Sequence, residues 1–504
     1  MTITGNSRPT ASRQFIANVI GRVWVLLANF LFAPVYLHLM GLGNFGVVGL
    51  YIAVSGLVAF LDLGLSPTIA RELNLQGRTE VARANLLYTY EAVYLVIIGV
   101  MIVTAMLLPE GVFGLFLAAD DLARPEVAGS IRLLFSAAAA QMLLNFYVAG
   151  LLGVEQQVAG NLVLVASGFV RSGLVILPLY FWPTPVVFMA WQLATALVCA
   201  VFARALLYQV IGSTGSAKRR AFDWGSVAGN SAFTGGMVLA SVTAAVNTQI
   251  DKIFVGKLAG LESLGQYSLV STFAQLLVFA VSPITIMLLP RLVRGASAGD
   301  SELVRRLFLV SHRLVAGIVC AGLASMLFFG PYLMSIWTAG KLDAESVGTF
   351  APMLVAGYAL LAISTVPHCV AVAYKNLTGS LVLSTSVFVT VPGYWFLAKE
   401  YGAAGAATMW LLLQSIVVPL YLAWVVRRLI GIPSVGRFMA STVLVPLVAA
   451  LAICALGYHL LGGSGELLRN LLVIAVAIVA SVGVCLRLSL APADRAFLLG
   501  GMDR

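Results

Sequence analysis

Two arginines lie inside long apolar stretches of the sequence, where a charged side chain is unfavourable unless something stabilises it. Arg22 lies in the run 15–39, and Arg171 lies near the middle of the run 157–181, one helical turn after Ser167. An arginine in lipid costs roughly a few kcal/mol unless it reaches water or a partner. Arg22 could extend to the interface, whereas we expect a cavity or a buried acidic partner for Arg171. Because guanidinium groups bind phosphate and carboxylate groups, the two arginines predict anion binding.

Further polar residues share a face with these candidates on two predicted helices. In the first stretch, four polar residues spaced by 4, 7 and 7 positions fall on one helical face. They are Asn18, Arg22, Asn29 and Tyr36. The same spacing returns in the stretch 227–256 at Asn230, Thr234, Ser241 and Thr248, with Lys252 one turn further. In lipid, such faces must contact protein or water. They are therefore candidates to line a substrate cavity, although hydrogen bonds between helices explain the uncharged members equally well.

Three acids within apolar stretches could carry a coupling ion. They are Asp62, Glu91 and Asp251. A carboxylate inside a membrane protein can take up and release a proton or bind a sodium ion. Asp62 and Glu91 could instead cap a helix or pair with Arg71 or Arg83, and Asp251 could form an interfacial pair with the next residue.

The cysteines and histidines indicate no metal site. The four histidines are isolated and match no metal-ligand spacing. The cysteines form no CxxC pattern and are expected to be small buried hydrophobes; they are Cys199, Cys320, Cys369, Cys454 and Cys485. We therefore expect no metal and no cofactor.

The composition shows what kind of fold must position these residues. Of 504 residues, 61% are hydrophobic and 10% are charged, where soluble domains have about 25% charged residues. The mean hydropathy of +0.99 excludes a soluble protein and predicts an all-α polytopic membrane protein. At about 20 apolar residues a span, we expect about fourteen transmembrane helices, near 15–39, 45–68, 85–109, 128–152, 157–181, 186–208, 227–256, 266–290, 303–329, 349–375, 379–398, 403–426, 437–461 and 467–490.

The distribution of basic residues predicts the orientation. Most of the 30 Lys and Arg residues fall in alternate loops, on the side where both termini would lie. By the positive-inside rule both termini are cytoplasmic, in what we expect to be a bacterial inner membrane. The basic residues form no dense patch, so no nucleic-acid partner is expected.

An internal repeat divides the chain. Gly41-Leu42 and Gly46 return 219 residues later as Gly260-Leu261 and Gly265, and Trp191 returns at the same shift as Trp410. Six spans separate the copies, so both have the same orientation, as in parallel-repeat transporters. We predict two parallel six-helix repeats plus two C-terminal helices: an N-terminus 1–14, bundles 15–208 and 227–426, a basic linker 209–226, and accessory helices with a tail at 427–504.

Several short segments of the sequence form recognisable motifs. They are GLGNFG at 41–46, LDLGL at 61–65, REL at 71–73, QIDKIFVG at 249–256, GQY at 265–267 and LPRL at 289–292. Together they resemble segments of one family of transporters, the Wzx-type polysaccharide flippases of the multidrug/oligosaccharidyl-lipid/polysaccharide (MOP) exporter superfamily.

The resemblance implies that the substrate is an undecaprenyl-pyrophosphate-linked oligosaccharide, moved from the cytoplasmic to the outer leaflet. It implies a cationic cavity, in which Arg22 and Arg171 would lie, and contact with membrane lipid. A polysaccharide polymerase and assembly proteins are further expected partners. The related lipid II flippases use their two last helices for the lipid tail, and the spans after 437 would do the same.

Three alternatives stay open. A cation-coupled multidrug antiporter of the same superfamily would need acids in the cavity rather than arginines. A lipid II flippase would need a denser set of cavity arginines. A glycosyltransferase or polymerase would need acid pairs or a large loop, and the adjacent Asp120 and Asp121 lie in a loop of under about twenty residues. We therefore expect a transporter rather than an enzyme.

Overall fold

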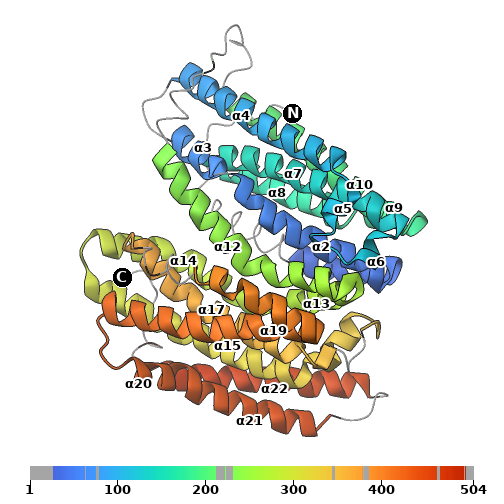
Figure 1. Cartoon of the computed structure of the whole chain (residues 1–504). Coiled ribbons are helices and arrows are strands. Elements are labelled where there is room, and N and C mark those ends of the chain that lie inside the picture. The colour runs from blue at the N-terminus through green and yellow to red at the C-terminus, as the bar shows by residue number, and fades with distance from the viewer. Residues whose placement is uncertain are drawn as a thin grey trace. The chain divides into compact units, whose positions relative to one another are not determined.

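A computed structural model of the chain describes residues 27–62, 64–74, 79–211, 222, 231–342, 347–376, 379, 385–461, 466–492 and 494. Every regular element in these ranges is helical (Figure 1). Ten of the described helices are long and apolar enough to cross a membrane, and Leu27–Met40 and Leu42–Val58 are shorter apolar helices. The predicted all-α fold of about fourteen transmembrane helices is thus confirmed.

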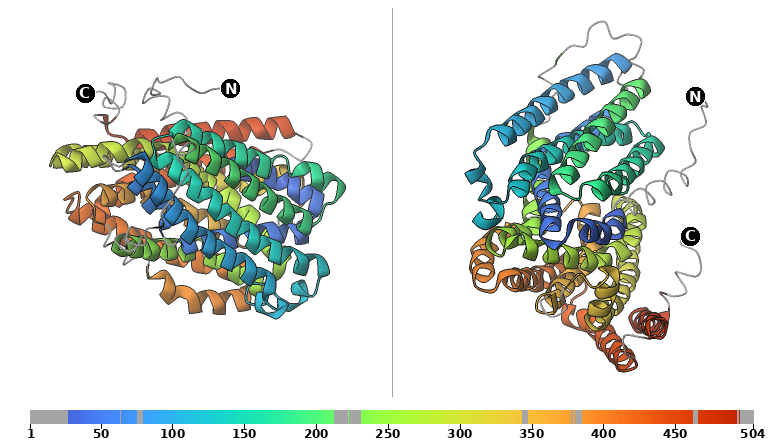
Figure 2. Two further views of the ribbon diagram at one scale, coloured as in Figure 1. Left: turned by 90° about the horizontal axis from the view of Figure 1, so that it is seen from above. Right: turned by 90° about the vertical axis from the view of Figure 1, so that its right-hand side faces the viewer.

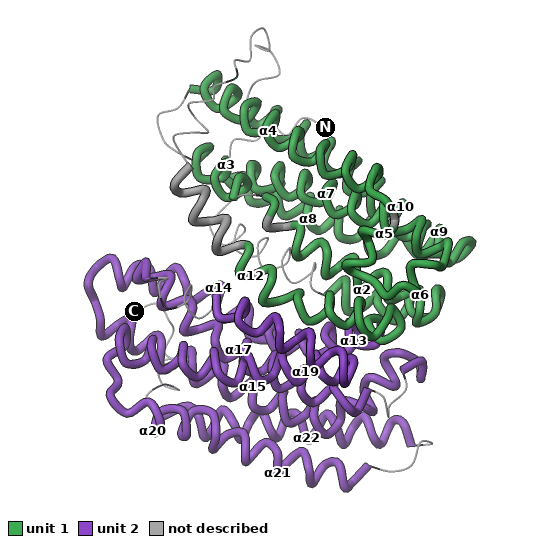
Figure 3. Tube along the Cα trace, in the orientation of Figure 1, with its two compact units in different colours: residues 1–265 green, residues 266–504 purple. Residues whose placement is uncertain are grey.

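The helices form two compact units, Met1–Gly265 and Gln266–Arg504 (Figure 3). The first contains Leu27–Met40, α2 (Leu42–Val58), η1 (Ala59–Asp62), α3 (Leu65–Asn74), α4 (Glu80–Leu107), α5 (Glu110–Phe113), α6 (Ala119–Leu122), α7 (Pro125–Gly153), α8 (Gln157–Ser172), α9 (Ile176–Phe181), α10 (Pro185–Val210) and α12 (Ser231–Leu258). The second contains α14 (Leu276–Ser297), α15 (Ser301–Trp337), α17 (Ala351–Ala373), α19 (Val387–Arg428), α20 (Val435–Met439), η2 (Ala440–Leu444), α21 (Val445–His459) and α22 (Leu467–Ser489). The unit boundary falls within α13 (Gly260–Ala274).

In the first unit, α7 is the central helix and α4 lies at the edge. The alanines at 137–140 of α7 are fully buried, because small side chains let α2, α3, α4, α8 and α10 pack closely against this helix. On α4, by contrast, Val96, Val100 and Val103 are exposed. Their spacing places an apolar stripe on one face, which is the face that a lipid-contacting helix presents.

In the second unit, α15 is the central helix and contacts α14, α17, α21 and α22. Figure 2 shows α21 and α22 running alongside each other at one edge of this unit. Cys320, Cys454 and Cys485 belong to the apolar cluster that joins α15 to these two helices. The prediction of buried cysteines is confirmed for these three and for Cys369, whereas Cys199 is half-buried.

Helix α19 covers two predicted spans, 379–398 and 403–426. It bends at Gly402, which has φ 56° and ψ −131°, a backbone conformation open to glycine and strained for other residues. The predicted boundary between these two spans therefore coincides with a kink at which one helix ends and the next begins.

The repeated glycine motif forms a reciprocal contact within the first unit. A Cβ atom added to Gly46 would lie 2.0 Å from the carbonyl oxygen of Leu261, and one added to Gly265 would lie 2.9 Å from the carbonyl oxygen of Leu42. Only glycine permits so close an approach of two backbones. The start of α2 and the start of α13 therefore pack on each other through equivalent residues of the two sequence copies.

Candidate functional site

The fifth predicted span is broken in the middle, and the break lies beside a cavity. Helix α8 ends at Ser172 and α9 begins at Ile176. Pro178 has no N–H to continue the helical ladder to Leu174, and the carbonyl of Leu174 instead accepts a bond from Leu177 at 3.1 Å. The break thus lies about one turn before Pro178.

Side chains from neighbouring helices satisfy three consecutive carbonyl groups at the end of α8. The indole Nε1 of Trp191 donates to the carbonyl of Val170 at 3.0 Å, and Nε2 of Gln192 donates to that of Arg171 at 3.3 Å. The hydroxyl of Tyr36 donates to the carbonyl of Ser172. The last carbonyls of a helix lack partners within it, so these three donors stabilise a helix end inside the membrane-spanning region.

Arg171 lies in this last turn of α8 and extends into the cavity. Its Nη1 donates to Oε1 of Gln141 at 3.0 Å, and Nε2 of Gln141 donates to Oδ1 of Asn145 at 3.1 Å. A cation near a helix C-terminus is favoured by the helix dipole. The structure therefore places Arg171 in a cavity, where its side chain bonds to an amide rather than an acid.

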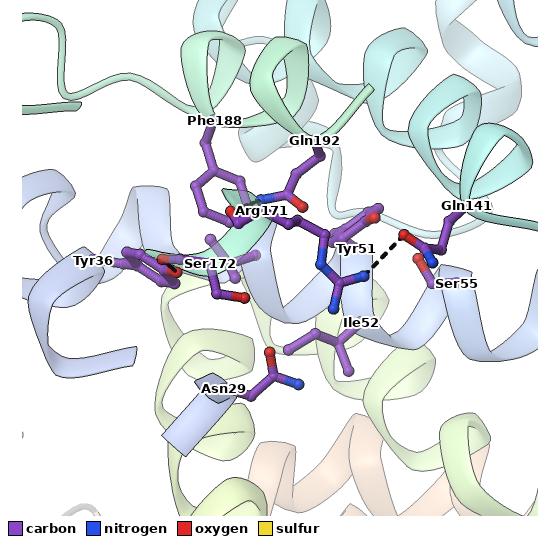
Figure 4. Close-up of a pocket in the computed structure, with 11 residues that line it drawn as sticks. Asn29, Tyr36, Tyr51, Ile52, Ser55, Gln141, Arg171, Ser172, Phe188 and Gln192 are labelled. Atoms are coloured by element: carbon purple, nitrogen blue, oxygen red, sulfur yellow. Dashed lines mark hydrogen bonds between the residues drawn. The ribbon is translucent and has the colours of Figure 1, made fainter. Parts of the chain in front are cut away.

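The cavity has a volume of ≈ 170 Å³ and lies wholly within the first unit. Figure 4 shows its polar side chains gathered around Arg171. The lining residues are Asn29, Tyr36, Val48, Tyr51, Ile52, Ser55, Gln141, Arg171, Ser172, Phe188 and Gln192. Asn29 and Arg171 were candidates from the sequence, whereas Tyr51, Ser55, Gln141 and Gln192 were not.

The second polar stripe is described only in part, and Thr248 and Lys252, its described members, are not among the residues that line this cavity. Asn18, Arg22 and Asn230 lie outside the described residues, as do the side chains of Thr234 and Ser241 on α12. Nζ of Lys252 donates to the carbonyl of Thr248 at 3.0 Å and lies 3.4 Å from Oδ1 of Asp251. Asp251 and Lys252 are 1% and 2% exposed, so they form a buried ion pair.

The other two candidate acids both hold helices together. Asp62 accepts bonds from the backbone N–H and the hydroxyl of Ser66, at 3.1 and 2.5 Å, and from the hydroxyl of Tyr94 at 2.6 Å. It therefore caps α3, and a helix cap is one of the alternatives that the sequence analysis gives for this residue. Arg71 and Arg83 are not its partners in these bonds.

Glu91 on α4 is 2% exposed and is bound from two other helices. The hydroxyl of Tyr147 on α7 donates to Oε1 of Glu91 at 2.6 Å, and Arg204 and Tyr208 on α10 donate to the same carboxylate. The cationic partner of Glu91 is therefore Arg204, and the alternative pair with Arg71 or Arg83 is wrong. In the described part of the chain, no three His, Cys, Asp or Glu residues gather as metal ligands would.

Comparisons with known proteins agree with this architecture. The sequence profile of a family described as "Polysaccharide biosynthesis protein" matches residues 12–296. No curated protein matches the chain.

Among solved structures, an inward-facing multidrug resistance MATE family transporter of the MOP superfamily has a TM-score of 0.60 at 15% identity, covering 84% of this chain and 96% of that one. The lipid II flippase MurJ in an inward closed conformation has a TM-score of 0.62 at 13% identity, covering 95% and 99%. A MOP superfamily transporter from Pyrococcus furiosus, titled for the reverse polarity of its binding pocket, has a TM-score of 0.55 at 16% identity, covering 84% and 96%.

Proposed function

Since the chain belongs to the polysaccharide biosynthesis protein family, we propose that it is a flippase for an undecaprenyl-pyrophosphate-linked oligosaccharide. It would move this lipid from the cytoplasmic to the outer leaflet of a bacterial inner membrane, for surface polysaccharide synthesis, without catalysing a reaction. A polysaccharide polymerase and assembly proteins would take over the product. Both termini would be cytoplasmic, as the positive-inside rule indicates.

The observation that carries the proposal is Arg171. Among the described residues that line the cavity, it has the only charged side chain, and this side chain donates a hydrogen bond to the neutral Gln141. A guanidinium in a site of low dielectric constant attracts an anion strongly. A diphosphate between lipid and sugar supplies that anion, and the aromatic and amide side chains around it suit a sugar.

The translocation step follows from the repeat. The headgroup would enter the polar cavity while the prenyl tail stays in lipid. Rocking of one six-helix repeat against the other would then expose the cavity to the two sides in turn. A proton or sodium gradient could drive this step, with Asp62, Glu91 or Asp251 as the carrier.

A lipid II flippase is the second candidate. It is favoured by the match to the lipid II flippase MurJ, which covers 95% of this chain, whereas the match to the MATE transporter covers 84%. A multidrug antiporter has less support, because its cationic substrates need an acid in the cavity, and the described lining has an arginine.

The proposal is tested in cells that lack the protein. We expect lipid-linked oligosaccharide to accumulate in the cytoplasmic leaflet, detected by leaflet-resolved labelling, and surface glycan to disappear. The double substitution Arg22→Ala and Arg171→Ala should lower export by about tenfold or more for each arginine, while Lys341→Ala, an exposed charge, should leave export unchanged. Normal glycan together with hypersensitivity to cationic dyes would instead support an antiporter, and accumulation of lipid II would support the second candidate.

A further inference from the structure

Two hydroxyl groups in the cavity have no hydrogen-bond partner in the described part of the chain. They belong to Tyr51 and Ser55, which lie one helical turn apart on α2 and line the same cavity as Arg171. Tyr51 is only 7% exposed, and the oxygen atoms of both hydroxyls are buried. Figure 4 shows both side chains on the side of the cavity where Arg171 contacts Gln141.

Other buried tyrosines in the first unit do have partners. Tyr36 donates to the carbonyl of Ser172, Tyr94 to Asp62 and Tyr147 to Glu91. A buried hydroxyl without a partner lowers the stability of the fold, so such groups are rare in native structures and call for an explanation. At Tyr51 and Ser55, the explanation must lie in the cavity that both groups line.

We propose that Tyr51 and Ser55 complete an oxyanion site with Arg171, and that this site binds a phosphoryl group of the lipid-linked substrate. Arg171 supplies charge and several N–H donors, of which Nη1 is directed to Gln141. The two hydroxyls supply further donors from α2. This inference rests on the proposed function and adds to it the residues that recognise the linker.

The donor pattern favours a phosphoryl group over a neutral sugar hydroxyl. A phosphoryl oxygen accepts several hydrogen bonds at once, and bonds from ionised or polar donors to an anion are roughly twice as strong as bonds between neutral groups. The nearby amide of Gln192 already donates to the carbonyl of Arg171. The unpartnered hydroxyls of α2 thus line the same cavity as the guanidinium of α8.

The test is a binding titration of the full-length protein in nanodiscs. The probe is N-acetylglucosamine linked to farnesyl diphosphate, followed by the change in tryptophan fluorescence. We expect Tyr51→Phe and Ser55→Ala each to weaken binding about tenfold, whereas Ser55→Thr, which keeps the hydroxyl, retains most of the affinity. Ser130→Ala is the matched control, because the hydroxyl of this buried serine already donates to the carbonyl of Val127, and it should leave the affinity unchanged.

Thermal stability separates recognition from a structural role. Removing a buried hydroxyl that has no partner should leave the melting temperature of Tyr51→Phe equal to or above that of the wild type. A fall in affinity together with unchanged or higher stability supports the proposal. A fall in both, with no loss specific to the diphosphate, contradicts it.

Further probes identify the source of the anion. With N-acetylglucosamine linked to farnesol without phosphate, the two substitutions should have no effect. Inorganic pyrophosphate should compete with the probe if the headgroup alone is recognised, and vesicles of phosphatidylglycerol should compete if any lipid phosphate suffices. If the wild type binds the diphosphate probe through Arg171 and the two variants bind it equally well, the role of the hydroxyls is refuted and the flippase proposal survives. If the wild type does not bind the probe, both are refuted.

Discussion

The fifth helices of the two sequence repeats begin from similar residues and end in different structures. In the first copy, α8 breaks at Ser172, and Trp191 donates to the carbonyl of Val170. At the same register, 219 residues later, Thr390 stands in place of Arg171 and Trp410 in place of Trp191. There α19 begins at Val387 and continues past Thr390, whose hydroxyl donates to the carbonyl of Val387 at 2.7 Å.

Trp410, which stands in the second copy where Trp191 stands in the first, does not make the equivalent hydrogen bond in the described residues. Nε1 of the buried Trp410 has no partner in the described residues, and the ring packs against Tyr358 with 5.4 Å between ring centroids. The comparison indicates that both copies keep the large side chain for packing, while the first copy alone uses it to hold an interrupted helix beside a cation. The equivalent positions thus differ in structure: Arg171 lines a polar cavity at a helix end, and Thr390 lies within α19.

Exchanging Arg171 and Thr390, the residues that distinguish the two copies, should have the largest effect on the export of surface glycan. Arg171→Thr makes the first copy resemble the second, and it should lower export of surface glycan by about tenfold or more, because the cavity loses its described charge. Adding Thr390→Arg should not restore export, since α19 runs on past Thr390 without the break that follows Arg171. Full restoration in the double variant, measured as surface glycan in complemented cells, would show that the two copies are interchangeable.

The two tryptophans should respond differently to the same substitution. Trp191→Phe removes a hydrogen bond to a helix end, and it should cost about 1 kcal/mol of stability and reduce export several-fold. Trp410→Phe removes an indole N–H that has no partner in the described chain, so its cost should be limited to lost packing. Thermal unfolding in detergent and glycan export measure both; equal losses of export would contradict the difference between the copies.

Tyr36→Phe should give the smallest effect. It removes the donor to the carbonyl of Ser172 but keeps the ring, which packs edge-on against Phe188 at 5.2 Å. Two other donors still stabilise the end of α8, so we expect a loss of about 1 kcal/mol or less and a modest decrease in export. The combination with Gln192→Leu should exceed the sum of the two single effects, because both act on one helix end.

The sequence alone predicts the fold well and the site in part. Apolar runs mark the spans because a membrane requires them, and Arg171 is conspicuous as a charge within such a run. Tyr51 and Ser55 give no such signal, since both residue types are ordinary in an apolar helix. Their lack of a partner is a property of the packed structure. The contact of Glu91 with Arg204 joins residues 113 positions apart, which no local pattern indicates.

The reciprocal contact between the two glycine motifs has a further consequence. Gly46 of the first copy contacts the backbone of Leu261 in the second, and Gly265 of the second copy contacts the backbone of Leu42 in the first. Each copy therefore uses the same two positions in the contact. This is the isologous geometry of a twofold-symmetric homodimer. Because each copy contributes the same residues to this contact, a side chain added at either glycine would disturb the same interface.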